Sequence, residues 1–272
     1  MYRKFSRASK TLQTGLIGIG LAAMVASSAS AHDFFILPTA FTTTTHGSLP
    51  VDVTIASKFP ELEIALGAER VAELRVAGDP QALFKAAGLG PKSMKTAFMA
   101  HAPGLAILSA RTPPREVEYP EARIAGILEE YQVSPEAVRS VEALPRPRVL
   151  KALSTRFAKS FVCVDRCDGG SDPTQPLGHS LEFVTAKGSA TSFTLLSKGA
   201  PLANYPAVIA KANGERLHLR TSDKGDLQLP AGLTGPVMLF AAVMQPPAKA
   251  GDRFMLDLAS LTLSGNQGPS AK

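Results

Sequence analysis

The chain has 272 residues, of which 45% are hydrophobic, and its formal net charge is +6. The first 31 residues carry four cations and no acid, so the remaining 241 residues carry a formal charge of only +2. This mild excess excludes the clustered basic face of a nucleic-acid-binding protein, and the length suits one large domain or two small ones.

The N-terminal segment is predicted to be a signal peptide. Its four cations precede or border the apolar stretch LIGIGLAAMVA, residues 16–26, and Ala29-Ser30-Ala31 forms an A-x-A cleavage site. The apolar stretch is shorter than the roughly 20 residues that a membrane span needs. We therefore expect residues 1–31 to be removed from an exported, soluble, periplasmic protein with no membrane span. A cut after Ala29 is a second possibility.

Residues 32–120 are predicted to form an N-terminal β-rich domain. Residues 32–43 are the first candidate strand, and residues 50–58 alternate apolar and polar side chains with the period of two that a strand with one buried face requires. Residues 69–77 fit either a strand or a short helix. Residues 95–111 hold two apolar runs around Pro103-Gly104, which is typical of a hairpin.

Residues 121–175 are predicted to form a helical insertion or linker. Ser134 is a candidate N-cap, because Pro135 follows at the first helical position and Glu136 lies in the first turn. In residues 149–161 the apolar side chains recur at helical spacing with Lys and Arg between them. Two or three short helices are therefore expected here.

Residues 176–264 are predicted to form a C-terminal β-sandwich, because short β-rich segments alternate with Gly, Pro, Asn and Asp. The predicted strands are 179–185, 191–197, 206–211, 216–221, 226–229, 236–244 and 254–264. Residues 265–272 are small and polar and are predicted to be a disordered tail. The expected fold class is thus mainly β.

The two cysteines, Cys163 and Cys167, are candidates for a disulfide. An exported protein meets an oxidising compartment, and the C-x-x-x-C spacing allows a local bridge if the chain turns after it. The rival interpretation is a pair of thiolate metal ligands.

Several stretches occur in an order that resembles one family. They are AHDFFILP, PGLAILSART, ILEEYQVSPEAV, RFAKSF, PLGHSLEFV, GAPLANYPAVIAKANGE, TSDKGDLQLP and ASLTL. The chain is similar to exported bacterial proteins classed as a domain of unknown function, some of them described as periplasmic components associated with nickel or cobalt uptake. The resemblance implies a β-rich fold with an immunoglobulin- or transthyretin-like C-terminal sandwich. The chain departs from the family at Phe35, where Trp is common, and at His179, where an apolar residue is usual.

His32 is the leading candidate for a metal ligand. Cleavage after Ala31 would make it the N-terminal residue, and its α-amine and imidazole Nδ1 could then chelate one ion in a six-membered ring. Cleavage after Ala29 would instead leave Ser-Ala-His, a sequence that binds Cu(II) or Ni(II) in a square plane. Nitrogen ligands suit nickel, cobalt, copper and zinc. Asp33 is adjacent and is expected to be solvated rather than a ligand.

A further imidazole is needed to complete a three-nitrogen site. His101 beside the Pro103-Gly104 turn is the first candidate, followed by His179 at the start of the sandwich and His46 at the far end of the first hairpin from His32. His218 alternates with leucines in a strand and is expected to lie on the surface. The histidines form no H-x-H, H-x-x-x-H or H-E-x-x-H pair, so any such site depends on the fold.

The sequence thus predicts a periplasmic accessory protein that binds nickel, cobalt or copper and has a membrane metal transporter as a possible partner. The chain has no G-x-S-x-G, Walker or G-x-G-x-x-G motif, and we expect no enzymatic activity. One alternative is a metal-free immunoglobulin-like interaction module that binds a transporter or an envelope partner. Another is a copper-dependent glycan oxidase, against which the absence of tryptophan argues.

Overall fold

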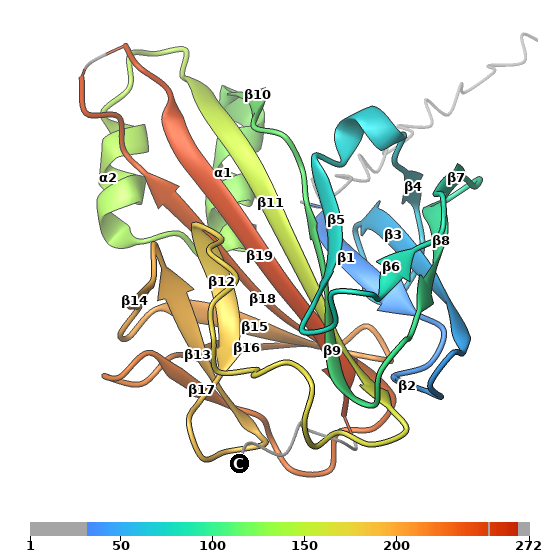
Figure 1. The fold of residues 1–272 in the computed structure, drawn as a ribbon. Coiled ribbons are helices and arrows are strands. Elements are labelled where there is room, and N and C mark those ends of the chain that lie inside the picture. The colour runs from blue at the N-terminus through green and yellow to red at the C-terminus, as the bar shows by residue number, and fades with distance from the viewer. Residues whose placement is uncertain (1–31, 250, 266–272) are drawn as a thin grey trace, which may run out of the picture.

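The computed structural model describes residues 32–249 and 251–265. The predicted signal peptide lies outside the described residues, as do residues 266–272 of the predicted tail. The described residues form three β-sheets and two α-helices (Figure 1).

The N-terminal sheet contains six strands in the order β1-β3-β8-β6, with β4 paired to β3 and β7 paired to β8. Their bounds are β1 Asp33–Pro38, β3 Ser48–Ala56, β4 Ile64–Ala65, β6 Leu83–Phe84, β7 Gly88–Leu89 and β8 Met94–Met99. Strands β1 and β3 are antiparallel, with Asp33 opposite Ala56 and Pro38 opposite Val51. This register places the residues just before β1 beside those just after β3, and residues 39–47 at the other end of the pair.

The central sheet contains nine strands in the order β16-β15-β18-β19-β11-β9-β5, with β10 and β2 also paired to β11. Their bounds are β2 Thr42–Thr43, β5 Glu73–Ala77, β9 Gly104–Arg111, β10 Arg115–Pro120, β11 Val149–Val164, β15 Pro206–Lys211, β16 Arg216–Arg220, β18 Pro236–Gln245 and β19 Phe254–Ser264. The middle of the sheet is the parallel pair β11 and β19, in which Ala152 lies opposite Phe254. This sheet therefore takes strands from both β-rich regions of the chain.

The third sheet contains four strands in the order β12-β13-β14, with β17 paired to β13. Their bounds are β12 Leu181–Thr185, β13 Ser192–Ser197, β14 Ala200–Pro201 and β17 Asp226–Gln228. Phe183 and Phe193 of this sheet share a buried cluster with Phe161, Leu239 and Leu261 of the central sheet. The two sheets form a β-sandwich, so the expected mainly β fold with a C-terminal sandwich is confirmed.

The N-terminal sheet also packs on the central sheet. Val51 and Val53 of β3 share a separate buried cluster with Leu108 of β9 and Val162 of β11. Strands β9 and β11 are therefore covered on both faces, as their place in the middle of Figure 1 suggests.

The two helices, α1 Glu121–Tyr131 and α2 Pro135–Glu142, lie beside the central sheet in Figure 1. Ile127 of α1 is buried, and the Tyr131 ring lies 6.3 Å from the ring of Phe240 on β18. Ser134 is the N-cap of α2, and its hydroxyl accepts a hydrogen bond from the N–H of Ala137. The prediction of short helices with this cap is confirmed for these segments.

The helix predicted within residues 149–161 is wrong, because this segment belongs to the 16-residue strand β11. Phe157 and Phe161 face the sandwich cluster, while Ala158 and Val162 face the cluster under the N-terminal sheet. A strand with two buried faces loses its apolar–polar alternation, and the remaining apolar positions happen to match helical spacing. Residues 69–77, which fit either structure, form a short 3-10 turn at Ala68–Arg70 followed by β5.

Candidate functional site

His32 lies at the start of β1, where its side chain contacts an acid from a later loop. Its Nε2 is 3.1 Å from Oε1 of Glu63, and the two side chains are 33% and 43% exposed. The β1–β3 register explains this meeting, because it brings the chain beyond Ala56 alongside the beginning of β1. The contact could not be found from sequence, since the two residues belong to different elements.

Ser57 fixes the Glu63 carboxylate in position. The other oxygen of Glu63 accepts hydrogen bonds from the backbone N–H of Ser57 at 2.7 Å and from its hydroxyl at 2.6 Å. These bonds, led by the one from the hydroxyl, lower the pKa of Glu63 below its usual value. The carboxylate is therefore ionised at neutral pH and acts only as a hydrogen-bond acceptor.

The main chain of His32 is held as well. The guanidinium of Arg156 on β11 donates a hydrogen bond to the His32 carbonyl oxygen. Both the ring and the backbone of His32 are thus oriented by residues from other elements.

Asp33, which was expected to be solvated, is buried at 1% exposure. Its Oδ2 pairs with Nη1 of Arg216 on β16 at 2.6 Å, and that guanidinium also lies over the ring of Phe240. Burial raises the pKa of Asp33, and the neighbouring Arg216 opposes this rise. The expectation is wrong because β1 packs against the central sheet, where Ser260 and Thr262 of β19 donate hydrogen bonds to its carbonyl oxygens and Arg216 of β16 pairs with its first residue.

His46 and His101 lie against each other, with ring centroids 5.4 Å apart and ring planes at 86°. His46 lies in the loop between β2 and β3, His101 lies between β8 and β9, and both are exposed. A hydrogen bond from the His46 N–H to the Ala100 carbonyl oxygen joins the two loops at 3.0 Å. The pair is at the opposite end of the β1–β3 hairpin from His32, so neither imidazole can complete a metal site at His32.

His179 is buried, with only 6% of its surface exposed. Its ring stacks on Phe157 at 4.9 Å, and its Nε2 is 3.2 Å from the hydroxyl of Ser109. Burial lowers the pKa of His179 to about 4. None of these neighbours contacts His32, so the structure does not bring His179 to the N-terminal histidine.

A buried ion pair lies next to His179. Nζ of Lys159 is 2.8 Å from Oε2 of Glu182, and the side chains are 3% and 2% exposed. Glu182 also accepts hydrogen bonds from the backbone N–H groups of Leu177, Gly178 and His179. These bonds stabilise the carboxylate and fix the loop before β12, a role that no motif in the sequence indicates.

The two cysteines and His218 make contacts within the protein with residues other than His32. Cys163 and Cys167 are joined by a disulfide, with their Cα atoms 4.7 Å apart. His218 lies on β16, is exposed as expected, and contacts Gln132 at the end of α1.

Residues 32–249 and 251–265 contain no preformed metal site. No group of three or more His, Cys, Asp or Glu side chains in these ranges is arranged to hold a metal ion. Neither of the helices there is long and apolar enough to cross a membrane.

Comparison with known structures gives distant matches. The D0-D1 domain of intimin matches 85% of this chain and 97% of its own at 13% identity and a TM-score of 0.24. Trypsin-activated alpha-2-macroglobulin from Escherichia coli matches 88% of this chain and 16% of its own, at 10% identity and a TM-score of 0.22. The match to the mouse nectin-like molecule 4 ectodomain covers 86% of this chain and 65% of the ectodomain chain, at 11% identity and a TM-score of 0.17.

No curated protein matches the chain. The family that does match is described as "Domain of unknown function (DUF4198)", and the match spans residues 29–243. It includes His32 with its contacts to Glu63 and Arg156, and it extends through β11 into β18. The chain therefore belongs to the DUF4198 family.

Proposed function

We propose that this chain is an exported periplasmic protein that binds a divalent nickel, cobalt or copper ion through His32 and assists metal uptake or handling without catalysing a reaction. The observation that supports the proposal best is the contact between His32 Nε2 and the Glu63 carboxylate at 3.1 Å.

This contact determines which nitrogen of a neutral His32 ring is free. An ionised carboxylate cannot donate a hydrogen bond, so Nε2 must carry the proton that Glu63 accepts. Nδ1 then keeps its lone pair. A metal-bound histidine commonly donates its other N–H to a carboxylate in this way, which orients the ring and increases its basicity.

Cleavage after Ala31 would place the α-amine on the same residue as the free Nδ1. The two nitrogens would chelate one ion, with the His32 carbonyl already held by Arg156. His46, His101 and His179 lie elsewhere, so further coordination positions would belong to water or to a partner. Such a partly open site suits a protein that passes its ion on, for example to a membrane transporter.

The test uses protein exported to a periplasm and analysed by native mass spectrometry. The apo mass gives the N-terminus, and titration with Ni²⁺, Co²⁺ and Cu²⁺ gives the stoichiometry and the affinity. We expect one ion bound at low micromolar concentration. His32→Ala, or one added residue before His32, should abolish this binding, and Glu63→Gln should weaken it about 10-fold or more because the ring loses the charged acceptor that orients it and increases its basicity.

His218→Ala is the matched control, since it removes an exposed histidine on β16. The double variant H46A/H101A tests the other imidazole pair. Binding that survives His32→Ala but disappears in H46A/H101A would move the metal site to the opposite end of the hairpin. Unchanged binding in every variant, or none in the wild-type protein, would contradict the proposal.

A metal-free interaction module is the second candidate, and an apolar groove favours it. The groove encloses about 730 Å³ between the end of α2, the start of β11 and the β18–β19 connection. Leu144, Pro145 and the exposed Val149 contribute apolar surface to it. This function predicts that Val149→Asp prevents capture of an envelope partner while His32→Ala has no effect.

A further inference from the structure

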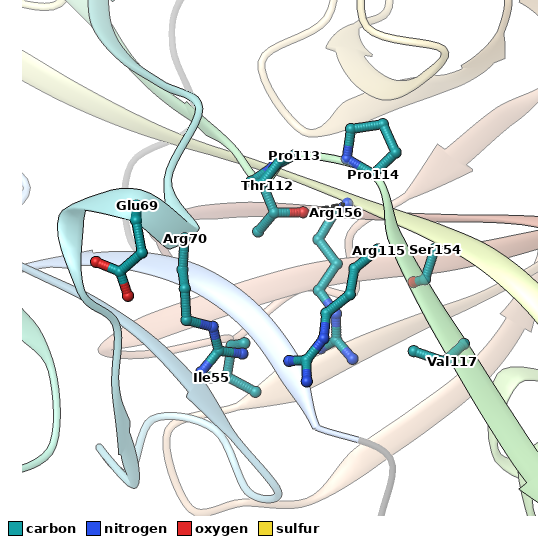
Figure 2. Close-up of a pocket in the computed structure, with 10 residues that line it drawn as sticks. All are labelled: Ile55, Glu69, Arg70, Thr112, Pro113, Pro114, Arg115, Val117, Ser154 and Arg156. Carbon is teal, nitrogen blue, oxygen red and sulfur yellow. Dashed lines mark hydrogen bonds between the residues drawn. The ribbon is translucent and has the colours of Figure 1, made fainter.

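A second pocket lies between the 3-10 turn Ala68–Arg70, the start of β10 and the middle of β11 (Figure 2). Its volume is about 190 Å³, below the roughly 300–1,000 Å³ of sites for drug-sized ligands. Its lining includes Glu69, Arg70, Arg115, Ser154 and Arg156.

Three guanidinium groups meet in this pocket. Arg70, Arg115 and Arg156 come from three different elements, and Figure 2 shows their guanidinium groups turned toward a common space. Glu69 is the only acid in this lining, and its carboxylate points away from Arg115 and Arg156. The pocket therefore carries a net positive charge.

Among the described residues these three cations form no direct ion pair with a carboxylate, and the charges of Glu69 and Asp33 act on Arg70 and Arg156 only from beyond ion-pair distance. Across the described ranges, Arg70 and Arg115 form no ion pair with a carboxylate, and Arg156 gives one N–H to the carbonyl oxygen of His32. Burial lowers the pKa of Arg70, and repulsion from Arg115 and Arg156 lowers it further. Holding like charges together in this way is unfavourable, and an anion bound between them would relieve it.

A buried hydroxyl and apolar walls complete the pocket. Ser154 is 5% exposed, and its Oγ has no hydrogen-bond partner among the described residues. Ser154 lies opposite Arg115 in the β10–β11 pair, so the two side chains share one face of the sheet. Val117 and Pro113 give the walls carbon surface, which suits a small organic ligand better than a fully hydrated inorganic ion.

We propose that this pocket binds a small dicarboxylate, with Arg70 and Arg115 each pairing with a carboxylate group. The planar guanidinium fork matches a carboxylate through two parallel N–H···O bonds. Arg156 adds a third positive charge, and the Ser154 hydroxyl is a donor within the lining. This site does not depend on metal binding at His32.

Isothermal titration calorimetry of the full protein in low-chloride buffer tests the proposal, with succinate as the probe and no metal present. We expect saturable binding of one succinate per chain. Arg115→Gln should weaken it 10-fold or more, because a charge-assisted pair is lost, and Arg70→Gln is the second variant. Arg123→Gln is the matched control, since this exposed arginine lies on α1 outside the pocket.

Circular dichroism shows whether each variant is folded, and either pocket variant is enough for the test. Inorganic phosphate is titrated in parallel. Phosphate that binds more tightly than succinate and displaces it would overturn the dicarboxylate assignment. Absence of saturable succinate binding, or an equal loss in Arg123→Gln, would overturn the site itself. Metal binding by Arg115→Gln should remain normal, so this result and the His32 result can be judged separately.

Discussion

At the scale of single residues, the buried His179 makes the stability of the fold depend on pH. Burial against Phe157 lowers the pKa of His179 to about 4, whereas an unfolded histidine has a pKa of about 6.5. Between these values the unfolded chain binds a proton that the folded chain does not. Stability should therefore fall as pH drops below about 6.5, and the full loss is reached below about 4.

This linkage predicts a loss of up to about 2 kcal/mol in the free energy of unfolding between pH 7 and pH 5. Urea unfolding at the two pH values measures it. His179→Gln removes the titrating group and should reduce the loss, whereas His218→Gln, on the exposed face of β16, should leave it unchanged. An equal pH dependence in the wild-type protein and His179→Gln would contradict the assignment.

The residue scale also shows what could be predicted about the candidate site. His32 was identified because its position after the A-x-A motif is local information. Glu63 and Ser57 could not be identified, because only the β1–β3 register brings them to the start of β1. The same limit applies to Arg70 and Arg115, whose pocket exists only after the fold has formed.

At the scale of elements, α2 illustrates a local signal that the fold preserves. The Ser134 hydroxyl accepts from the N–H of Ala137 at 3.2 Å. Ser134→Ala should reduce the free energy of unfolding by about 1 kcal/mol, because a helical N–H loses its partner.

Ser140→Ala is the control on the same helix. Its hydroxyl donates to the Glu136 carbonyl oxygen within the helix, and alanine is the better helix former, so this change should be neutral or slightly stabilising. The urea midpoints of both variants, measured at one pH, test the contrast. Similar losses in both would mean that the hydroxyl of Ser134 is not acting as a cap.

Strand β11 illustrates the opposite case. Local pattern predicted a helix over part of it, and burial on both faces removed the alternation that identifies a strand. Strand β3 of the N-terminal sheet alternates exposed and buried side chains in its first half, and this segment was predicted as a strand. The inner strands β18 and β19 were predicted despite burial on both faces, so β11 was missed because Lys and Arg between its apolar residues imitate the pattern of a helix.

At the scale of the whole molecule, the central sheet depends on its last strand. β19 pairs with β11 on one side and β18 on the other, and Ser260 donates a hydrogen bond to the Phe34 carbonyl oxygen. A chain that ends at residue 253 should fail to form a cooperative fold, because β11 and β18 would lose the strand that joins them and the central sheet would be divided in two.

Tryptic digestion and urea unfolding test this prediction. A chain that ends at Gly265 is the control, since it keeps every described strand. A protease-resistant, cooperatively unfolding product from the shorter chain would show that the first part of the molecule is independent of β19.

The pairing of β11 with β19 also constrains when this protein can fold. Ala152 pairs with Phe254, so about a hundred further residues must be synthesised after Ala152 before β11 can pair with β19. Until then, two long apolar strands have open edges and can pair with other chains. An incomplete chain therefore exposes strand edges that the finished molecule covers, which makes it the form most prone to aggregation.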